Sequence, residues 1–187
     1  MAIDQGTTLL RLARNAIAES LGEPTAVGDH AGWLDDPGAT FVTLMHRGDL
    51  RGCIGTLIAE RPLHEDVTSN ARAAAFRDPR FAPVTQRDFT ELNIEVSLLS
   101  PLEPILFESE SHLMSLLRPG IDGVLLEHGW QRGTFLPQVW EQLPEPKVFL
   151  AHLKRKAGLP ADFWARDIRI SRYSVTKWRE PGSRRLS

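Results

Sequence analysis

The only cysteine of the chain stands between two glycines in the run Leu50-Arg51-Gly52-Cys53-Ile54-Gly55-Thr56-Leu57. A thiol that ionises is a nucleophile, and a nearby positive charge favours its ionised form. Arg51 lies two positions before Cys53, so on a regular strand both side chains share a face. There the guanidinium would lower the pKa of the thiol or hold an anionic substrate. The alternative is a buried, unreactive cysteine, which packs as a small hydrophobic side chain.

The glycines of this run support the interpretation as a site. Glycine weakens the interior of a strand unless the backbone bends or another group approaches it closely. Gly52 and Gly55 would therefore admit either a ligand or another backbone. We expect Gly52, Ile54, Gly55 and Thr56 to contact a bound small molecule.

A nucleophilic cysteine needs a base and an orienting group. Glu95, on the polar side of an alternating strand, is a candidate base or fixed anion, and the alternative is an ordinary solvent-facing residue. Spacing does not choose among the histidines, although His46 and His64 flank the motif and His152 falls between inward positions of a helix. The six are His30, His46, His64, His112, His128 and His152.

The run Thr134-Phe135-Leu136-Pro137-Gln138-Val139-Trp140 is a second candidate for ligand binding. Thr134, Gln138 and Trp140 offer a hydroxyl, an amide and an indole N–H, the polar groups that small-molecule pockets use. The alternative is packing around a strand that ends at a proline, which accounts for Phe135 better than for Gln138.

The sequence predicts no metal site and identifies no cofactor. Neither C-x-x-C nor H-E-x-x-H occurs, and one cysteine with scattered histidines has no ligand spacing. The run Gly120-Ile121-Asp122-Gly123 lacks the glycine pattern and the lysine of a phosphate loop, and we interpret it as a turn.

Composition favours one globular domain of 187 residues, 42% of them hydrophobic, without a membrane span or signal peptide. A single cysteine excludes an internal disulfide, so we expect a cytoplasmic protein. Residues 1–146 carry 11 Lys/Arg and 21 Asp/Glu, whereas residues 147–187 carry 11 and 3. We interpret the basic end as complementing the acidic body or facing solvent, rather than as a nucleic-acid site.

The elements are inferred from periodicity and turn residues. Asp4 or Thr7 would cap a first helix that stops at Gly22. We expect Trp33, Trp130, Trp164 and Trp178 to be core or lobe-contact residues. The last strand, over 168–178, changes phase, which indicates a bulge near residues 171–172. The other expected elements are a hairpin over 39–57, helices over 63–76, 111–117 and 147–157, a strand over 92–98, a hairpin over 124–136, a helical turn over 137–143 and a disordered tail over 181–187.

Hairpins mixed with helices, without steady βαβ alternation, favour an α+β fold with a mainly antiparallel sheet flanked by helices. The segments Asp78-Pro79-Arg80-Phe81, Ile94-Glu95-Val96-Ser97 and Pro119-Gly120-Ile121-Asp122-Gly123, with the two runs above, resemble the AMMECR family. The resemblance covers roughly Leu9 to Glu180. The bacterial and archaeal members of this family are called protein A of the AmmeMemoRadiSam system. It implies two sub-lobes with a cleft, within a single domain over 1–180. It also implies association, through gene context, with a Memo-like protein of the dioxygenase type and a radical SAM protein, but supplies no reaction.

Two hypotheses of function follow. In the first, the protein is an enzyme or enzyme subunit whose cleft is formed by residues 50–57 and 134–140, with Cys53 as reactive group, Arg51 as anion anchor and Glu95 or a histidine as base. In the second, it is a non-catalytic module that binds a ligand or partner.

Overall fold

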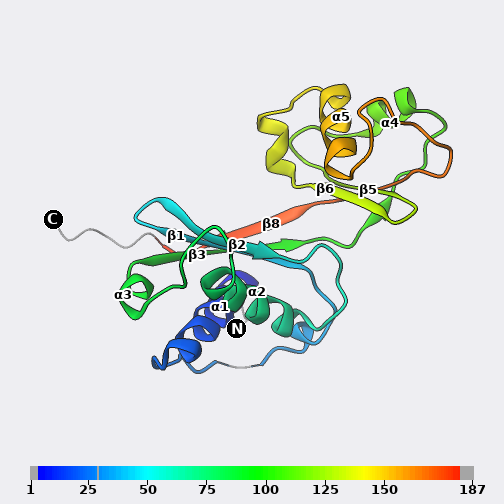
Figure 1. The fold of residues 1–187 in the computed structure, drawn as a ribbon. Coiled ribbons are helices and arrows are strands. Elements are labelled where there is room, and N and C mark those ends of the chain that lie inside the picture. The colour runs from blue at the N-terminus through cyan, green and yellow to red at the C-terminus, as the bar shows by residue number, and fades with distance from the viewer. Residues whose placement is uncertain (1–3, 29, 182–187) are drawn as a thin grey trace. The chain divides into compact units, whose positions relative to one another are not determined.

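The computed structural model describes residues 4–28 and 30–181 and divides into two compact units. Unit 1 contains the chain up to Leu99 and again from Thr176, and unit 2 contains Ser100–Val175. Each unit is built on an antiparallel sheet of four strands with helices packed against it (Figure 1). The predicted α+β class is confirmed, with two sheets in place of the one that was expected.

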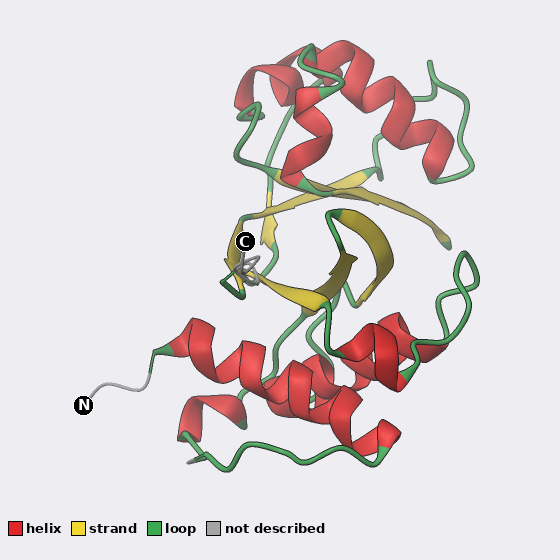
Figure 2. Cartoon of the chain, turned by 90° about the vertical axis from the view of Figure 1, so that its left-hand side faces the viewer, coloured by secondary structure: helices red, strands yellow, loops and turns green. Residues whose placement is uncertain are grey.

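Unit 1 has the strand order β2-β1-β3-β8. Helices α1 and α2 lie along one face of this sheet (Figure 2). Its elements are α1 (Gln5–Leu21), the 3-10 helix η1 (Gly32–Leu34), β1 (Thr40–His46), β2 (Asp49–Gly55), α2 (Leu63–Phe76), α3 (Gln86–Phe89), β3 (Leu92–Leu99) and β8 (Val175–Arg179).

Local sequence explains helix α1 of unit 1. The Asp4 side chain accepts a hydrogen bond from the backbone N–H of Thr7 and caps α1, and Gly22 ends it in the left-handed conformation. Leu9 and Ile17 of α1 are fully buried and pack with Val42 and Ile94 of the sheet. The helical apolar period therefore places one continuous core on one side of the sheet.

Unit 2 has the strand order β4-β7-β5-β6. Its core contains Phe149 and Leu153 from α5, packed against Val124 and Leu126 from β5, and Trp140 stacks on Phe149 with ring centroids 3.7 Å apart. Its elements are β4 (Glu103–Pro104), α4 (Glu110–Leu116), β5 (Gly123–His128), β6 (Gln131–Phe135), the 3-10 helix η2 (Pro137–Glu141), α5 (Pro146–Lys156) and β7 (Arg169–Tyr173).

The expected last strand over 168–178 is wrong as a single element. It consists of two strands, β7 and β8, which are separated at Ser174 and belong to different sheets. Ile170 of β7 packs in the core of unit 2, whereas Trp178 of β8 packs against that of unit 1. The change of phase in the sequence marks this passage from one sheet to the other, not a bulge at residues 171–172.

Trp130 corrects a second expectation. It occupies the two-residue turn between β5 and β6, beside Gly129 with its positive φ, and its surface is 91% exposed. A side chain at the tip of a hairpin projects away from the sheet that the strands build, so Trp130 is not a core residue. The other three tryptophans that we predicted to pack, Trp33, Trp164 and Trp178, do lie against the hydrophobic cores of their units.

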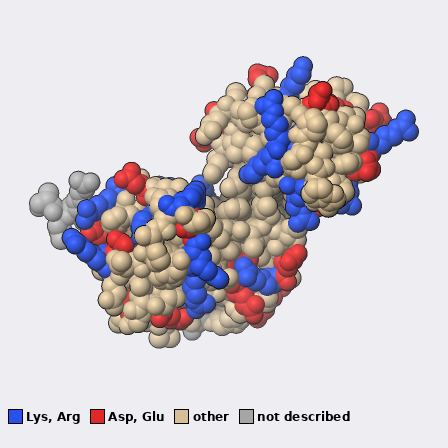
Figure 3. All heavy atoms as spheres, viewed as in Figure 1, with Lys and Arg blue, Asp and Glu red and all other residues tan. Residues whose placement is uncertain are grey.

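The basic C-terminal region forms ion pairs with carboxylates from earlier in the chain. Lys154 lies 2.5 Å from Glu110 and Arg172 lies 2.7 Å from Glu103, both within unit 2. In unit 1, Lys177 and Arg179 both contact Glu95. Acidic and basic side chains are mixed on the visible face of each unit (Figure 3). The expected complementation of the acidic body is therefore present inside the fold.

Candidate functional site

The Cys53 thiol lies at the edge-strand end of a polar row on the sheet of unit 1. Thr43 of β1 is directly opposite Cys53 of β2 on one side and Glu95 of β3 on the other. Directly opposed residues of antiparallel strands share a face, so these three side chains lie together on the face turned away from α1 and α2. The Thr43 hydroxyl donates a hydrogen bond of 3.3 Å to Sγ of Cys53, which is half-buried.

Arg51 does not share this row. The pairing of β1 and β2 shifts by one residue between Leu44 and Met45, and Arg51 is the additional residue of the bulge. Its guanidinium donates to the backbone carbonyls of Ala82 and Pro83 and contacts the Asp88 carboxylate at 3.3 Å. The expected pairing of Arg51 with the thiol assumed an unbroken two-residue period, and the bulge breaks that period.

Arg80 is the arginine that contacts Cys53, and sequence reasoning gave it no role. It donates a hydrogen bond of 3.2 Å to the backbone carbonyl of Cys53 and forms an ion pair of 2.7 Å with Asp78. The hydrogen bond from Arg80 is the largest influence that holds the pKa of the buried Asp78 carboxyl well below its ordinary range. The run Asp78-Pro79-Arg80-Phe81, which pairs an acidic with a basic residue, is the sequence feature that could have indicated this contact with Cys53.

Asp78 and Arg80 together complete the edge of the sheet. Strand β2 is an edge strand, whose outward backbone groups lack a neighbouring strand. The Asp78 carboxylate accepts a hydrogen bond of 2.9 Å from the N–H of Cys53, and Arg80 donates to its carbonyl. Two side chains thus satisfy the backbone groups that another strand would otherwise pair.

Glu95 is buried at 5% exposure, so it is not the solvent-facing residue of the alternative interpretation. Burial acts to raise its pKa, but hydrogen bonds from Arg179 and Lys177 outweigh burial and lower the pKa below its ordinary value. The Arg179 and Lys177 contacts measure 2.6 Å and 3.0 Å. A carboxylate held in its ionised form by two cations is a weak proton acceptor, so the geometry fits a fixed anion better than a general base.

Other parts of unit 1 fill the space that a side chain at either glycine of the motif would need. A methyl group at Gly52 would lie 2.1 Å from the backbone carbonyl oxygen of Ala74 in α2, and one at Gly55 would lie 2.3 Å from the Phe41 ring. Of the two explanations for the Gly52 position, the close approach of another backbone therefore applies. Ile54 packs partly against the core of unit 1.

Thr56 belongs to a buried network around Asp66 that the sequence did not suggest. Asp66, in the first turn of α2, accepts hydrogen bonds from the Thr56 hydroxyl, from the backbone N–H and hydroxyl of Thr40 and from Nε of Arg61. Asn70 donates to the same carboxylate. The network joins the ends of β1 and β2 to α2, which is a structural role.

The second run, residues 134–140, lies in unit 2. The Thr134 hydroxyl lies 2.9 Å from both the Val124 carbonyl and the Tyr173 hydroxyl, and the Trp140 indole N–H donates to the Asp122 carbonyl at 2.7 Å. Two of the three polar groups expected to bind a ligand therefore already have partners within the unit. Gln138 is exposed, and Phe135 packs edge-on against Phe149.

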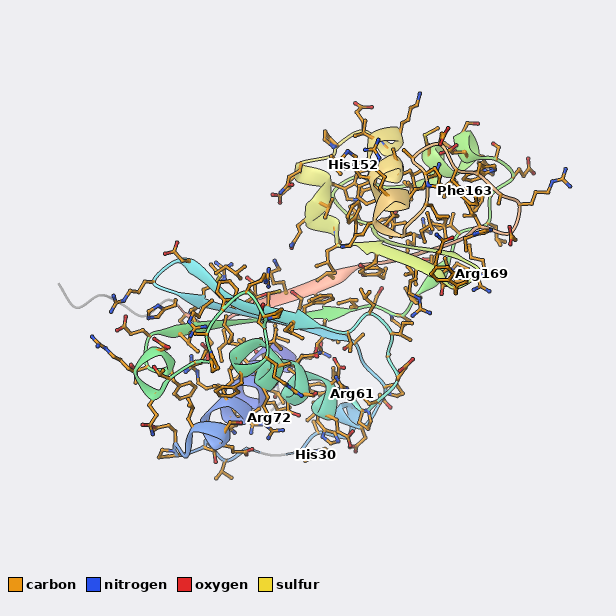
Figure 4. The ribbon with its side chains drawn as sticks, viewed as in Figure 1. His30, Arg61, Arg72, His152, Phe163 and Arg169 are labelled. Carbon is orange, nitrogen blue, oxygen red and sulfur yellow. The ribbon has the colours of Figure 1, made fainter. Side chains whose placement is uncertain are left out.

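No histidine contacts Sγ of Cys53 within residues 4–28 and 30–181. His46 lies 3.6 Å from Glu91, His64 and His30 both lie near Asp35, and His128 lies 3.3 Å from Asp167. His152 is exposed on α5 (Figure 4), although it falls between inward residues of that helix. In the same part of the chain, no cluster of three or more His, Cys, Asp or Glu could hold a metal ion.

These observations define the class of the molecule. It is an α+β protein with two sheet-based units, one of which carries a free thiol on the sheet face turned away from its helices. A family model described as AMMECR1 matches residues 10–178. The chain belongs to the AMMECR1 family.

Several proteins similar to this chain come from archaea. A protein of Methanothermobacter thermautotrophicus is 38% identical over 184 residues, which are 96% of each chain. A protein of Methanocaldococcus jannaschii is 35% identical over 96% of this chain and 92% of its own. The crystal structure of an uncharacterised protein from Pyrococcus horikoshii matches with a TM-score of 0.81 and 34% identity, covering 95% of this chain and 92% of that one. Among the described residues, no helix combines the length and apolar character that crossing a membrane requires.

Proposed function

We propose that the protein is an enzyme or enzyme subunit whose reactive group is the Cys53 thiol. The observation that carries this proposal is the hydrogen bond of 3.3 Å from the Thr43 hydroxyl to Sγ. A nucleophilic thiol needs a group that orients it, and a donor aimed at sulfur can do so. Thr43 is therefore a positioning residue that holds the sulfur in place.

Arg80 replaces Arg51 as the proposed anchor for an anionic substrate. Its Nε and Nη2 bind Asp78, and Nη2 also binds the Cys53 carbonyl, while the side chain remains 54% exposed. Nη1 has no hydrogen-bond partner among the described residues, so the guanidinium retains donors for a carboxylate or phosphate oxygen. Glu95 would act as a fixed negative charge and not as the base. In the second run, Gln138 remains the candidate ligand contact.

The test is the alkylation of Cys53 in the folded protein with iodoacetamide at several pH values between 6 and 9, followed by mass spectrometry. We expect the folded thiol to take up one label, because Cys53 is only half-buried on its strand. The Cys53→Ser variant, which should take up no label, is the control. A thiol that stays unlabelled throughout this range would end the proposal of a nucleophile.

A second candidate is a non-catalytic binding module that acts with a Memo-like protein and a radical SAM protein. The observation in its favour is that no histidine and no unpaired carboxylate contacts Sγ of Cys53 in the described residues. Retained partner binding and full activity in cells with Cys53→Ser would favour this function. A single domain over 1–180 in the cytoplasm, where thiols stay reduced, suits both candidates.

A further inference from the structure

Unit 2 has a hollow of about 630 Å³ where strand β4 leaves the sheet. The backbone of β4 pairs with β7 up to Ile105, whose N–H donates to the Ile170 carbonyl, and the chain then departs. The hollow lies between the departing segment and the start of β7. Its lining residues are Pro104, Ile105, Leu106, Phe107, Glu127, Arg166, Ile168, Arg169, Ile170 and Ser171.

The lining combines apolar side chains with arginines. Ile105, Ile168 and Ile170 are buried core residues that form the apolar part, and Phe107 packs against Trp164 with ring centroids 5.6 Å apart. Leu106 is 87% exposed. Pockets for small molecules have this character, with apolar walls and a few polar groups that fix the orientation of the ligand.

The charges around the hollow leave two guanidinium groups unused. Within the described part of the chain, neither Arg166 nor Arg169 has an ion-pair partner, and both are exposed. Glu127 lies opposite Arg169 in the sheet, but its carboxylate contacts Arg132 at 3.2 Å. The Asp167 carboxylate lies 3.3 Å from Nε2 of His128. The nearby carboxylates are thus already partnered.

Figure 4 shows Arg169 at the start of β7, beside the β5–β6 hairpin. Two arginines and one carboxylate line the hollow, and that carboxylate, Glu127, also contacts Arg132 outside the lining, so the hollow has an excess of positive charge that favours an anionic ligand. A carboxylate accepts paired hydrogen bonds from a guanidinium in a fixed planar geometry.

We propose that this hollow binds a small organic monocarboxylate with an apolar body. The carboxylate lies against Arg166 and Arg169, and the apolar body contacts Ile105, Ile168 and Phe107. This site is independent of Cys53, which belongs to unit 1. Failure of this proposal would therefore leave the function proposed for Cys53 unaffected, and the reverse also holds.

The experiment is a titration of the isotope-labelled full chain followed by two-dimensional amide NMR. Octanoate is the probe; 1-octanol, which lacks the charge, and acetate, which lacks the apolar body, are the comparisons. We expect octanoate to shift the amide signals of residues 104–107 and 166–171 saturably, and the other two probes to bind at least tenfold more weakly. Octyl phosphate, tested in parallel, should not bind more tightly than octanoate.

Arg169→Gln and Arg166→Gln should each weaken octanoate binding about tenfold, because one charge-assisted hydrogen-bond pair is lost. Arg155→Gln is the matched control, since Arg155 is an exposed arginine of α5 that does not line the hollow. The two test positions are exposed, so both variants should fold, and a thermal melt checks each. Equal binding of octanol, tighter binding of octyl phosphate, an equal loss in Arg155→Gln or shifts elsewhere in the chain would overturn the proposal.

Discussion

The carboxylate of Asp78 accepts a hydrogen bond of 2.9 Å from the backbone N–H of Cys53, on the open edge of the unit 1 sheet. Arg80 binds this carboxylate and also donates to the carbonyl of Cys53. One acidic and one basic side chain thereby hold both outward backbone groups of the residue that carries the thiol. The position of the sulfur depends on a loop that follows α2 as much as on the strand itself.

This arrangement predicts that Asp78→Ala destabilises the protein by about 2 kcal/mol at pH 7, because it leaves the Cys53 amide and Arg80 without their acceptor. The pKa of Asp78 is lower in the folded state than in the unfolded chain. Its contribution is therefore complete above pH of about 4 and declines as the pH falls toward the folded-state pKa. Urea unfolding at pH 7 and pH 3 measures this. The gap between wild type and variant should narrow at pH 3, and an unchanged gap contradicts the assignment.

Thr43→Val should slow the alkylation of Cys53, because the sulfur loses the hydroxyl that donates a hydrogen bond to it and holds it in position. We expect a several-fold decrease in the labelling rate at pH 7. Thr43→Ser, which keeps a hydroxyl, is the matched control and should react at the rate of the wild type. Equal rates for all three proteins would show that Thr43 does not act on the thiol.

Gly52→Ala should destabilise unit 1 by about 1–3 kcal/mol, because a new methyl group must displace the backbone of α2 at Ala74. Gly32→Ala is a suitable control, since its position is open, its φ is not in the left-handed region, and surface changes of this kind stay within about 0.5 kcal/mol. Urea midpoints of the two variants provide the comparison. Equal midpoints would mean that the backbone of α2 moves away from the new methyl group without a loss of stability.

Tyr173 provides a direct measurement, because it is the only tyrosine of the chain. Burial raises its pKa to about 12, despite the opposing hydrogen bond with Thr134. The phenol is thus protonated more strongly in the fold than in the unfolded chain, whose tyrosine pKa is about 10. This stabilisation is complete below pH of about 10 and is lost as the pH rises toward 12.

Absorbance at 295 nm should therefore show a phenolate transition near pH 12 for the native protein and near pH 10 in urea. Tyr173→Phe should remove the transition and lessen the loss of stability above pH 10. A native transition at pH 10 would place the Tyr173 hydroxyl in water, contrary to its hydrogen bonds with Thr134 and the Phe135 carbonyl.

Much of each unit could be predicted from the sequence. The cap at Asp4, the stop at Gly22, the first hairpin and the strand over residues 92–98 depend on neighbours within a few positions, and these elements are present as expected. The wrong expectations depend on long-range pairing. The division at Ser174 reflects which sheet each half of the segment joins, and a local period does not contain that choice.

The candidate site divides in the same way. The sequence alone determined that Cys53 lies on a strand between glycines, because residue type and spacing are local properties. Only the tertiary structure decided which groups meet the thiol. A one-residue bulge removes Arg51 from the row, and register brings Thr43 and Glu95 into it. A distant loop supplies Asp78 and Arg80, because hydrogen-bonding groups on a sheet edge must find partners wherever the folded chain provides them.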